Sequence, residues 1–328
     1  MKKYDVLVVG GATIDVFVDT DFADIKVNSD GMEEEFIAYP EGSKLRINRL
    51  FFSTGGGGTN AAAGFSTMGL KTGFLGIVGS DENGSKIIRE LKKNKVDFLG
   101  KRSRKHPSGY SIILDSVGHD RTILSHRGAN EHLSVDSKTL NSFKTKWVHL
   151  ASLSGQSLNA LKRIAEHCRE NNVPFSYNIS TYVAKNGLIP IKDIIEGCSV
   201  FILNKEEAGY LLSSSQTKER IMLKKLKNEG PSAVVITDGK RGIFALDSSD
   251  KYYRVKAHDI KVVEGTGAGD AFCSGFLSAL IKKRSFSEAL EIGLANSESV
   301  IQIKGAKNGL LSLRKAKKIV SSTASNTS

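Results

Sequence analysis

Short apolar runs alternate with amphipathic helical patterns along most of this chain, and this alternation limits the folds that it can adopt. Buried strands flanked by helices are typical of a largely parallel sheet with helices on both faces. Six strands are predicted, at Val6–Val9, Phe74–Val78, Trp147–Leu150, Phe175–Asn178, Val200–Leu203 and Val234–Thr237. Helices are predicted at 59–68, 83–94, 156–170, 216–228, 268–283 and 286–302. Ligands of such α/β sheets bind beyond the carboxyl ends of the strands.

Two regions, about 14–54 and 108–126, lack helical periodicity and instead read as strands with turns. In the second region, Ser116–Asp120 is the expected turn of a hairpin. We expect the two regions to pair into a small β lid on a domain that spans 1–320. Lids of this kind exclude water from a reaction site.

The apolar residues Ile47, Phe51 and Ile113 fall within these strands. An open sheet that exposes such side chains predicts a homodimer that forms through the lid. The polar segment 321–328 is expected to be a disordered tail.

The composition argues against several classes of partner. No run of 18 apolar residues could cross a membrane, and glycines and Asp15 interrupt the apolar N-terminal segment. The net charge of +12 comes from clusters without interleaved aromatic residues, which favours solvated helix faces over a nucleic-acid site. The three cysteines are far apart and lack metal-site spacing, which is typical of a reducing cytoplasm.

The segment EGTGAGDAF at 264–272 places one carboxylate, Asp270, among three glycines at the start of a predicted helix. Free backbone N–H groups and the helix dipole favour an anion at such a point. A carboxylate inside an anion site is electrostatically unfavourable. The simplest interpretation is a base beside a phosphate.

A second glycine-rich segment, STGGGGTNAAAG at 53–64, has four consecutive glycines followed by Asn60. Glycine lets a ligand approach the backbone, and the Asn60 amide can both donate and accept hydrogen bonds, which suits sugar hydroxyls. Asp15, just beyond the first strand, could bind a polyol or could be a turn aspartate. Arg127 and Asn130, at the edge of the lid, could also contact a substrate, whereas His126 is expected to be a surface residue.

The segment LNKEEAGYLL at 203–212 follows a buried strand. Asn204 and Glu207 could hold the water shell of Mg²⁺, or they could form a helix capping box, which the two residues alone favour. The segment VVITDGKRG at 234–242 predicts a hairpin whose loop could carry a nucleotide on Thr237 and Gly239. The segment GSDENGSK at 79–86 departs from the P-loop order and is not a Walker site.

Together these motifs resemble the ribokinase-like (pfkB) carbohydrate kinase family. The specific matches are GGGGTN at 55–60 and EGTGAGD at 264–270, and weaker matches extend over roughly 5–310. The resemblance implies a three-layer α/β/α sandwich with a β lid. It also implies a kinase that uses ATP and Mg²⁺ to phosphorylate a sugar-like hydroxyl.

The resemblance further implies roles for individual residues. Asp270 would be the general base, and the amides of Gly267, Ala268 and Gly269 would form the anion hole. The acceptor would be bound by Asp15, Gly56, Gly57, Asn60, Arg127 and Asn130. ATP would lie against Asn204, Thr237, Gly239, Gly242, Gly267 and Asn296. Asn204 and Glu207 would organise Mg²⁺, which reverses the preference for a pure cap.

Two departures from the family pattern bear on the substrate. Glu264-Gly265 replaces the usual Asp-Thr, so Glu264 could bind a monovalent cation such as K⁺ or could have lost that role. Gly57 carries no basic side chain, which favours an unphosphorylated sugar or sugar acid, either ribose-like or 2-keto-3-deoxygluconate-like. Nucleosides are the alternative acceptors, followed by phosphofructokinase-type acceptors. Outside the enzymes, a non-catalytic nucleotide- or sugar-binding regulator would share the fold.

Overall fold

A nine-stranded sheet forms the centre of the molecule in the computed structural model, which describes residues 2–20, 23–29, 32–115, 121–214 and 217–325. The strand order is β19-β18-β17-β16-β15-β14-β2-β7-β9, and neighbours from β17 to β9 are parallel. The antiparallel strands β18 and β19 form one edge. The bounds are β2 (Val6–Val9), β7 (Thr72–Leu75), β9 (Val96–Phe98), β14 (Val148–Ala151), β15 (Phe175–Asn178), β16 (Val200–Asn204), β17 (Ala233–Thr237), β18 (Ile243–Leu246) and β19 (Tyr252–Val255).

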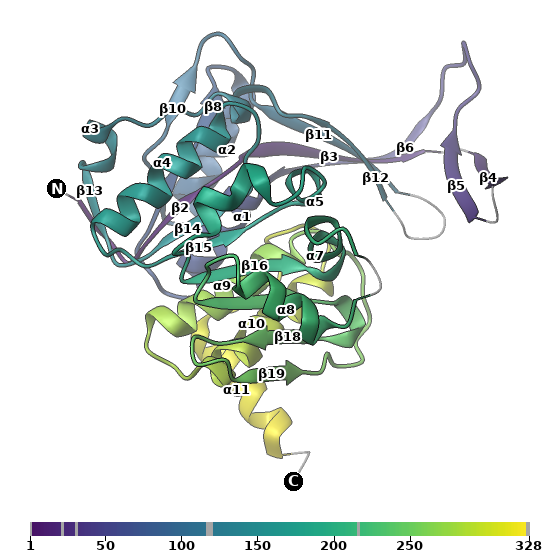
Figure 1. The fold of residues 1–328 in the computed structure, drawn as a ribbon. Coiled ribbons are helices and arrows are strands. Elements are labelled where there is room, and N and C mark those ends of the chain that lie inside the picture. The colour runs from purple at the N-terminus through teal and green to yellow at the C-terminus, as the bar shows by residue number, and fades with distance from the viewer. Residues whose placement is uncertain (1, 21–22, 30–31, 116–120, 215–216, 326–328) are drawn as a thin grey trace.

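Helices cover both faces of this sheet, as predicted for a three-layer sandwich (Figure 1). Successive strand residues point to opposite faces, so Leu7 and Val9 pack in one apolar core while Val6 and Val8 pack in the other. The first core includes α4 (Ser157–Glu170), α6 (Lys192–Ile195), α7 (Lys205–Leu211) and α8 (Glu219–Lys227). The second includes α1 (Gly57–Thr67), α2 (Glu82–Lys93), α9 (Ala268–Ile281), α10 (Phe286–Ile301) and α11 (Leu313–Ser325).

The predicted helices are all present, with bounds that differ by at most three residues. The single strand predicted at 74–78 is wrong, because the chain leaves the main sheet at Gly76 and continues as β8 (Ile77–Gly79). Strand β8 pairs instead with β10 (Lys101–Ser103). The remaining short elements are β1 (Lys2–Tyr4), β13 (Phe143–Thr145), η1 (Gly128–Glu131), α3 (Ser137–Leu140), α5 (Thr181–Ala184), η2 (Ile189–Ile191) and η3 (Gly239–Arg241).

A separate four-stranded sheet is built from the two regions without helical periodicity. Its order is β12-β11-β3-β6, from β3 (Thr13–Thr20), β6 (Ile47–Gly55), β11 (Gly109–Asp115) and β12 (Arg121–His126). Strands β11 and β12 pair antiparallel, and the turn predicted between them lies outside the described residues. The sheet extends away from the body of the molecule, with β4 (Ala23–Ser29) and β5 (Met32–Ala38) at its far end (Figure 1).

The apolar side chains of this sheet are only partly exposed. Ile47 and Phe51 are nearly half exposed, together with Leu50, Phe52, Ile123 and Leu124. Ile113 is 1% exposed, which contradicts its expected place on the open surface. Strand β11 is an inner strand between β3 and β12, and Ile113 lies beside the buried Phe17.

Three smaller expectations concern the chain as a whole. Residues 321–325 continue helix α11, so the tail predicted from residue 321 begins inside a helix. Within the described part of the chain, no helix is both long and apolar enough to span a bilayer. All three cysteines are buried and free.

Candidate active site

The two glycine-rich segments meet through one hydrogen bond between their helices. Asn60 lies in the first turn of α1 and Asp270 in the first turn of α9. The Asn60 amide nitrogen donates to Asp270 Oδ2 at 2.9 Å. Residues 55–60, here called the first glycine loop, therefore lie against residues 264–270, the second glycine loop.

The Asp270 carboxyl is a better base than an ordinary aspartate. Burial raises its pKa to about 6, and the negative charge of Asp15 acts in the same direction. The Asn60 hydrogen bond and the positive charge of Lys307 oppose this rise. Gly57 lies beside the same carboxyl, because a Cβ there would be 3.2 Å from Asp270 Oδ1. The absence of a side chain at position 57 leaves this oxygen uncrowded.

Two further polar groups of the first glycine loop and β3 face this region. Asn60 Oδ1 is buried and has no hydrogen-bond partner within the described residues. A buried amide oxygen without a partner costs free energy unless a ligand or water satisfies it. Asp15 is buried beside Gly55, whose missing side chain makes room for the carboxylate. Thr13 Oγ1 donates to Asp15 Oδ1 at 2.7 Å, and burial raises the Asp15 pKa.

The second glycine loop is held from behind by residues 301–307, here called the C-terminal loop. Gly267 adopts a left-handed conformation, with φ of 84°, and a Cβ there would lie 2.6 Å from the Ala306 carbonyl oxygen. The Gly305 amide donates to the buried Glu264 Oε2 at 2.8 Å. Among the expected anion-hole amides, Ala268 N–H makes a 3.3 Å bond to the Gly265 carbonyl oxygen. That amide must exchange partners to contact an anion.

Sequence reasoning missed Lys307. Its ammonium group donates to the carbonyl oxygen of Thr54 and, at 2.6 Å, to the Thr54 hydroxyl. Burial lowers the Lys307 pKa to about 8, against the attraction of nearby carboxylates. In the sequence Lys307 is one of 47 basic residues, and only its place directly after the IQIKGA match could have drawn attention to it.

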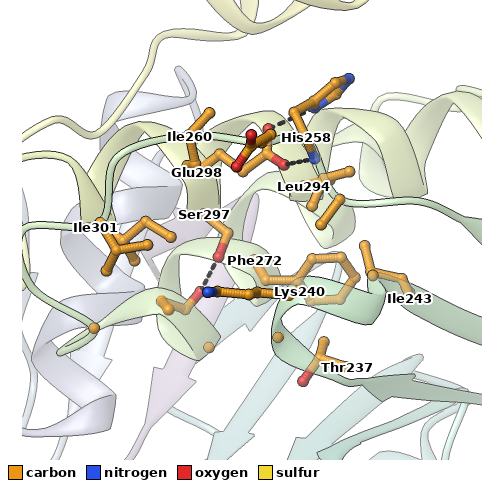
Figure 2. Close-up of a pocket in the computed structure, with 18 residues that line it drawn as sticks. Thr237, Lys240, Ile243, His258, Ile260, Phe272, Leu294, Ser297, Glu298 and Ile301 are labelled. Carbon is orange, nitrogen blue, oxygen red and sulfur yellow. Dashed lines mark hydrogen bonds and ion pairs between the residues drawn. The ribbon is translucent and has the colours of Figure 1, made fainter. Parts of the chain in front are cut away.

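A cavity of about 450 Å³ opens beside the second glycine loop and has the size expected of a small-ligand site. Thr237, Gly239 and Gly242, which we predicted to bind a nucleotide, line it together with Ala268 and Gly269. The additional lining residues labelled in Figure 2 are Lys240, Ile243, His258, Ile260, Phe272, Leu294, Ser297, Glu298 and Ile301.

Three polar residues of this cavity make contacts within it (Figure 2). The His258 amide nitrogen donates to Glu298 Oε1 at 2.8 Å, and His258 Nδ1 lies 2.8 Å from Glu298 Oε2. Ser297 Oγ donates to the Ala268 carbonyl oxygen at 3.0 Å. Sequence reasoning did not find these three residues, because α10 shows no motif beyond its helical pattern and His258 lies in the irregular segment between β19 and α9.

Two residues that we predicted to contact ligands, Asn296 and Asn130, form hydrogen bonds with the protein backbone instead. Asn296 is fully buried and does not line the cavity; it donates to the Ala271 carbonyl oxygen and accepts from the Leu311 amide. It faces inward on α10, whereas Ser297 and Glu298 face the cavity. Asn130 holds the backbone of Ala12 through both its amide oxygen and its amide nitrogen.

Arg127 and His126 lie where β12 returns to the body of the molecule. The Arg127 guanidinium lies 4.2 Å from the centre of the Tyr182 ring, which is the distance of a cation–π contact. His126 is exposed, as expected of a surface residue. The stacking holds a positive charge between the end of the four-stranded sheet and α5.

Asn204 and Glu207 form the capping box that their spacing predicted. The Asn204 side chain accepts from the Glu207 amide, and Glu207 Oε2 accepts from the Asn204 amide at 2.9 Å. Burial raises the Glu207 pKa to about 7. In the part of the chain that the structure describes, no three acidic, histidine or cysteine residues gather as a direct metal site. Oxygen atoms engaged in a cap fit Mg²⁺ better through its water shell than as direct ligands.

Comparisons with known proteins agree with this architecture. The model of the pfkB family of carbohydrate kinases matches residues 22–313. A protein of Archaeoglobus fulgidus described as an uncharacterized sugar kinase is 29% identical over 254 residues, covering 75% of this chain and 98% of its own. Ribokinase of Schizosaccharomyces pombe is 28% identical over 277 residues, covering 80% and 85%.

The same fold is found in solved structures. The nucleoside kinase of Methanocaldococcus jannaschii, described as an archaeal member of the ribokinase family, has a TM-score of 0.79 at 22% identity. The alignment covers 98% of this chain and 99% of that chain.

Proposed function

The chain belongs to the pfkB family of carbohydrate kinases, and from this premise we propose that it transfers the γ-phosphoryl group of ATP to a hydroxyl of a small unphosphorylated sugar or sugar acid. The observation that carries the proposal is the contact between Asn60 and Asp270 beside a buried, unpartnered amide oxygen. This arrangement suits a ligand that both gives up a proton and donates hydrogen bonds.

The acceptor hydroxyl is proposed to lie next to Asp270 Oδ1, in the space that Gly57 leaves open. Asp270 takes the hydroxyl proton while the hydroxyl oxygen forms its bond to the γ-phosphorus and the bond to the β-phosphate oxygen breaks. Asn60 Oδ1 and the Asp15 carboxylate accept hydrogen bonds from other hydroxyls of the same sugar. Together these contacts would fix which hydroxyl reacts. Gly56 lets the loop pack closely on the segment that follows β2, because a Cβ there would lie 2.6 Å from the Gly11 carbonyl oxygen.

ATP is proposed to fill the cavity beside the second glycine loop, with its base against Phe272, Leu294 and Ile301. Its γ-phosphate would then face the amides of residues 267–269 at the start of α9. The N-terminus of a helix favours negative charge, so these amides would stabilise the phosphoryl group during transfer. Lys240, which extends across the cavity in Figure 2, would contribute a positive charge.

Two metal sites are proposed around this arrangement. Mg²⁺, which neutralises phosphate charge in such reactions, would be held through water by Asn204 and Glu207. Glu264 is the buried first residue of the second glycine loop, and it is proposed as a ligand for a monovalent cation such as K⁺. Activity in potassium compared with tetramethylammonium salts tests the second site directly.

The four-stranded sheet is proposed to act as a lid over the acceptor, and its exposed apolar side chains to meet a second copy of the chain. Leu50, Phe51 and Phe52 of β6 and Ile123 and Leu124 of β12 supply this surface. The three free, buried cysteines fit a reducing compartment, so we place the enzyme in the cytoplasm.

The choice between neutral and acidic acceptors rests on Arg127. A guanidinium held on Tyr182 can bind a carboxylate in a bidentate manner, and this favours a sugar acid over a neutral pentose. A nucleoside is the second candidate, because the Tyr182 ring could also stack on a base. The phosphorylated acceptor of a phosphofructokinase ranks third, because Gly57 brings no charge.

The experiment is ADP release from ATP and Mg²⁺ over a panel of aldoses, ketoses, sugar acids, nucleosides and fructose 6-phosphate. We expect the highest kcat/KM with a sugar acid and a lower value for that acceptor in Arg127→Gln. Turnover of nucleosides alone would contradict the proposed acceptor class. Binding of ATP without turnover of any acceptor would instead favour a regulator.

A further inference from the structure

Lys307 links the end of β6 to the C-terminal loop, and the proposed reaction assigns it no role. We propose that Lys307 is a positioning residue that fixes the end of β6 against the second glycine loop and supplies the positive charge that attracts Asp15 and Asp270. This inference rests on the proposed function, since it concerns the same acceptor site.

The first step of the argument is the rigidity of the C-terminal loop. The amides of Val263 and Glu264 both donate to the Ile301 carbonyl oxygen, at 2.8 and 3.0 Å. The Gly305 amide donates back to the Glu264 side chain. Ala306 fills the space where Gly267 lacks a side chain. The backbone that carries Lys307 is thereby fixed to the loop expected to hold the phosphate.

The second step is what the ammonium group holds. It donates to both oxygens of Thr54, the residue of β6 that immediately precedes the first glycine loop. Thr54 is buried and pairs with Ile14, next to Asp15 on β3. The following residue, Gly55, lies against the Asp15 carboxylate, and its carbonyl oxygen accepts from Thr59 Oγ1 at 2.6 Å. A shift of Thr54 would therefore move the groups expected to bind the acceptor.

The third step is charge. The carboxylates that interact with Lys307 come from three elements: Glu90 of α2, Asp15 of β3 and Asp270 of α9. The Lys307 side chain also lines a narrow gap with Thr59, Ile87 and Leu91 that has no room for water. Lys307 lowers the pKa of both Asp15 and Asp270 against the effect of burial. The negative charge of Asp15 disfavours the ionised form of Asp270, and that of Glu264 disfavours the ionised form of Asp15.

The alternative role for this partly buried lysine is purely structural, as a link between β6 and the C-terminal loop. A structural link would affect stability but would leave the acidity of Asp270 unchanged. A cation that keeps Asp270 ionised must change the acid limb of the pH profile. The two roles are therefore separable by experiment.

The test compares wild type, Lys307→Met, Lys307→Arg and the control Lys304→Met, an exposed lysine of the same loop. In Lys307→Met we expect kcat/KM for the acceptor to fall by about tenfold or more, with the KM for ATP within about threefold of wild type. Its acid limb should move to higher pH from the wild-type value near 6. Lys304→Met should match wild type in all three measurements.

Lys307→Arg gives the complementary result. In wild type the Lys307 charge is lost as pH rises through about 8, so kcat/KM for the acceptor should fall on the alkaline side. Arginine stays protonated there, so this alkaline fall should be absent. An unmoved acid limb in Lys307→Met, with an acceptor kcat/KM within threefold of wild type, would overturn the proposal.

A readout without substrate covers the remaining outcomes. The Tm of the ligand-free protein is measured from pH 5 to pH 8 for wild type, Lys307→Met and Lys304→Met. Without the Lys307 charge, the ionised Asp15 and Asp270 destabilise the fold more, so Tm should fall more steeply with rising pH. Parallel Tm curves for wild type and Lys307→Met would refute the proposed role of Lys307, whether or not any acceptor is phosphorylated. A failure to phosphorylate any acceptor of the panel would count against the proposed function alone. If Lys307→Met does not fold, Thr54→Val, which removes one ammonium contact, should show the same acceptor-specific loss in smaller measure.

Discussion

Replacing Asp270 with asparagine should abolish most turnover and at the same time stabilise the protein. The change removes the proton acceptor but keeps the size of the side chain, and an asparagine oxygen can still accept from the Asn60 amide. A general base contributes about 10²–10⁴-fold to a rate. We therefore expect kcat to fall by that factor, which corresponds to about 2.7–5.4 kcal/mol of transition-state stabilisation.

The stability gain follows from the same carboxyl. Its pKa is raised from 3.8 to about 6 in the folded protein, chiefly by burial. A raised aspartate pKa means that the ionised form destabilises the fold above pH 6, and that this cost is relieved as pH falls through 6 towards 4. The difference corresponds to up to about 3 kcal/mol at pH 7.5. Asp270→Asn should therefore raise Tm by a few degrees at pH 7.5 and by little at pH 4.5.

The assay pairs steady-state kinetics on the best acceptor with thermal unfolding at both pH values, and calorimetry checks that ATP still binds. Asp193→Asn is the control, since that aspartate lies on the surface in an ion pair with Lys162. It should leave kcat unchanged. A kcat for Asp270→Asn within tenfold of wild type would refute the base assignment. An unchanged or lower Tm at pH 7.5 would refute the electrostatic argument.

Three other changes probe the surroundings of the site. Gly267→Ala should lower stability by about 2–5 kcal/mol in denaturant unfolding, because the left-handed backbone and the Ala306 carbonyl 2.6 Å away both oppose a Cβ; full stability would contradict this packing. Glu298→Ala removes the hydrogen-bond partner of His258 and should raise the KM for ATP by about three- to tenfold, with the acceptor KM unchanged. Equal effects on both KM values would argue against a nucleotide cavity. Phe51→Ser should weaken dimer formation in sedimentation by about tenfold or more, and a wild-type monomer at micromolar concentration would remove the predicted interface.

Local patterns predicted the elements and the two loops well, because their signals lie close together in sequence. Apolar periodicity fixed the helices, and the spacing of Asn204 and Glu207 predicted the capping box. The prediction of a single strand at 74–78 was wrong because Gly76 lies inside an apolar run, and nothing in the sequence indicates that the chain changes sheets there. The predicted exposure of Ile113 was wrong because its burial depends on β3, which is almost 100 residues away in sequence.

The site residues that sequence reasoning misplaced or missed share one property. Each depends on the direction in which a side chain points from a regular element or loop. Asn296 and Ser297 are adjacent on α10, yet one is buried against α9 and the other lines the cavity. Lys304 and Lys307 are three residues apart, yet only the second turns inward to Thr54. No periodicity in an irregular loop predicts that difference.

The acidity of Asp270 connects these observations to the chemistry. A base works best when its pKa lies just below the working pH, because it is then ionised and still binds a proton strongly. With a pKa of about 6, Asp270 is about 90% ionised at pH 7, and it binds a proton roughly 100-fold more strongly than an ordinary aspartate. Burial alone would raise the pKa further. The Asn60 hydrogen bond and the Lys307 charge oppose that rise, so the first glycine loop and the C-terminal loop together set the strength of the proposed base.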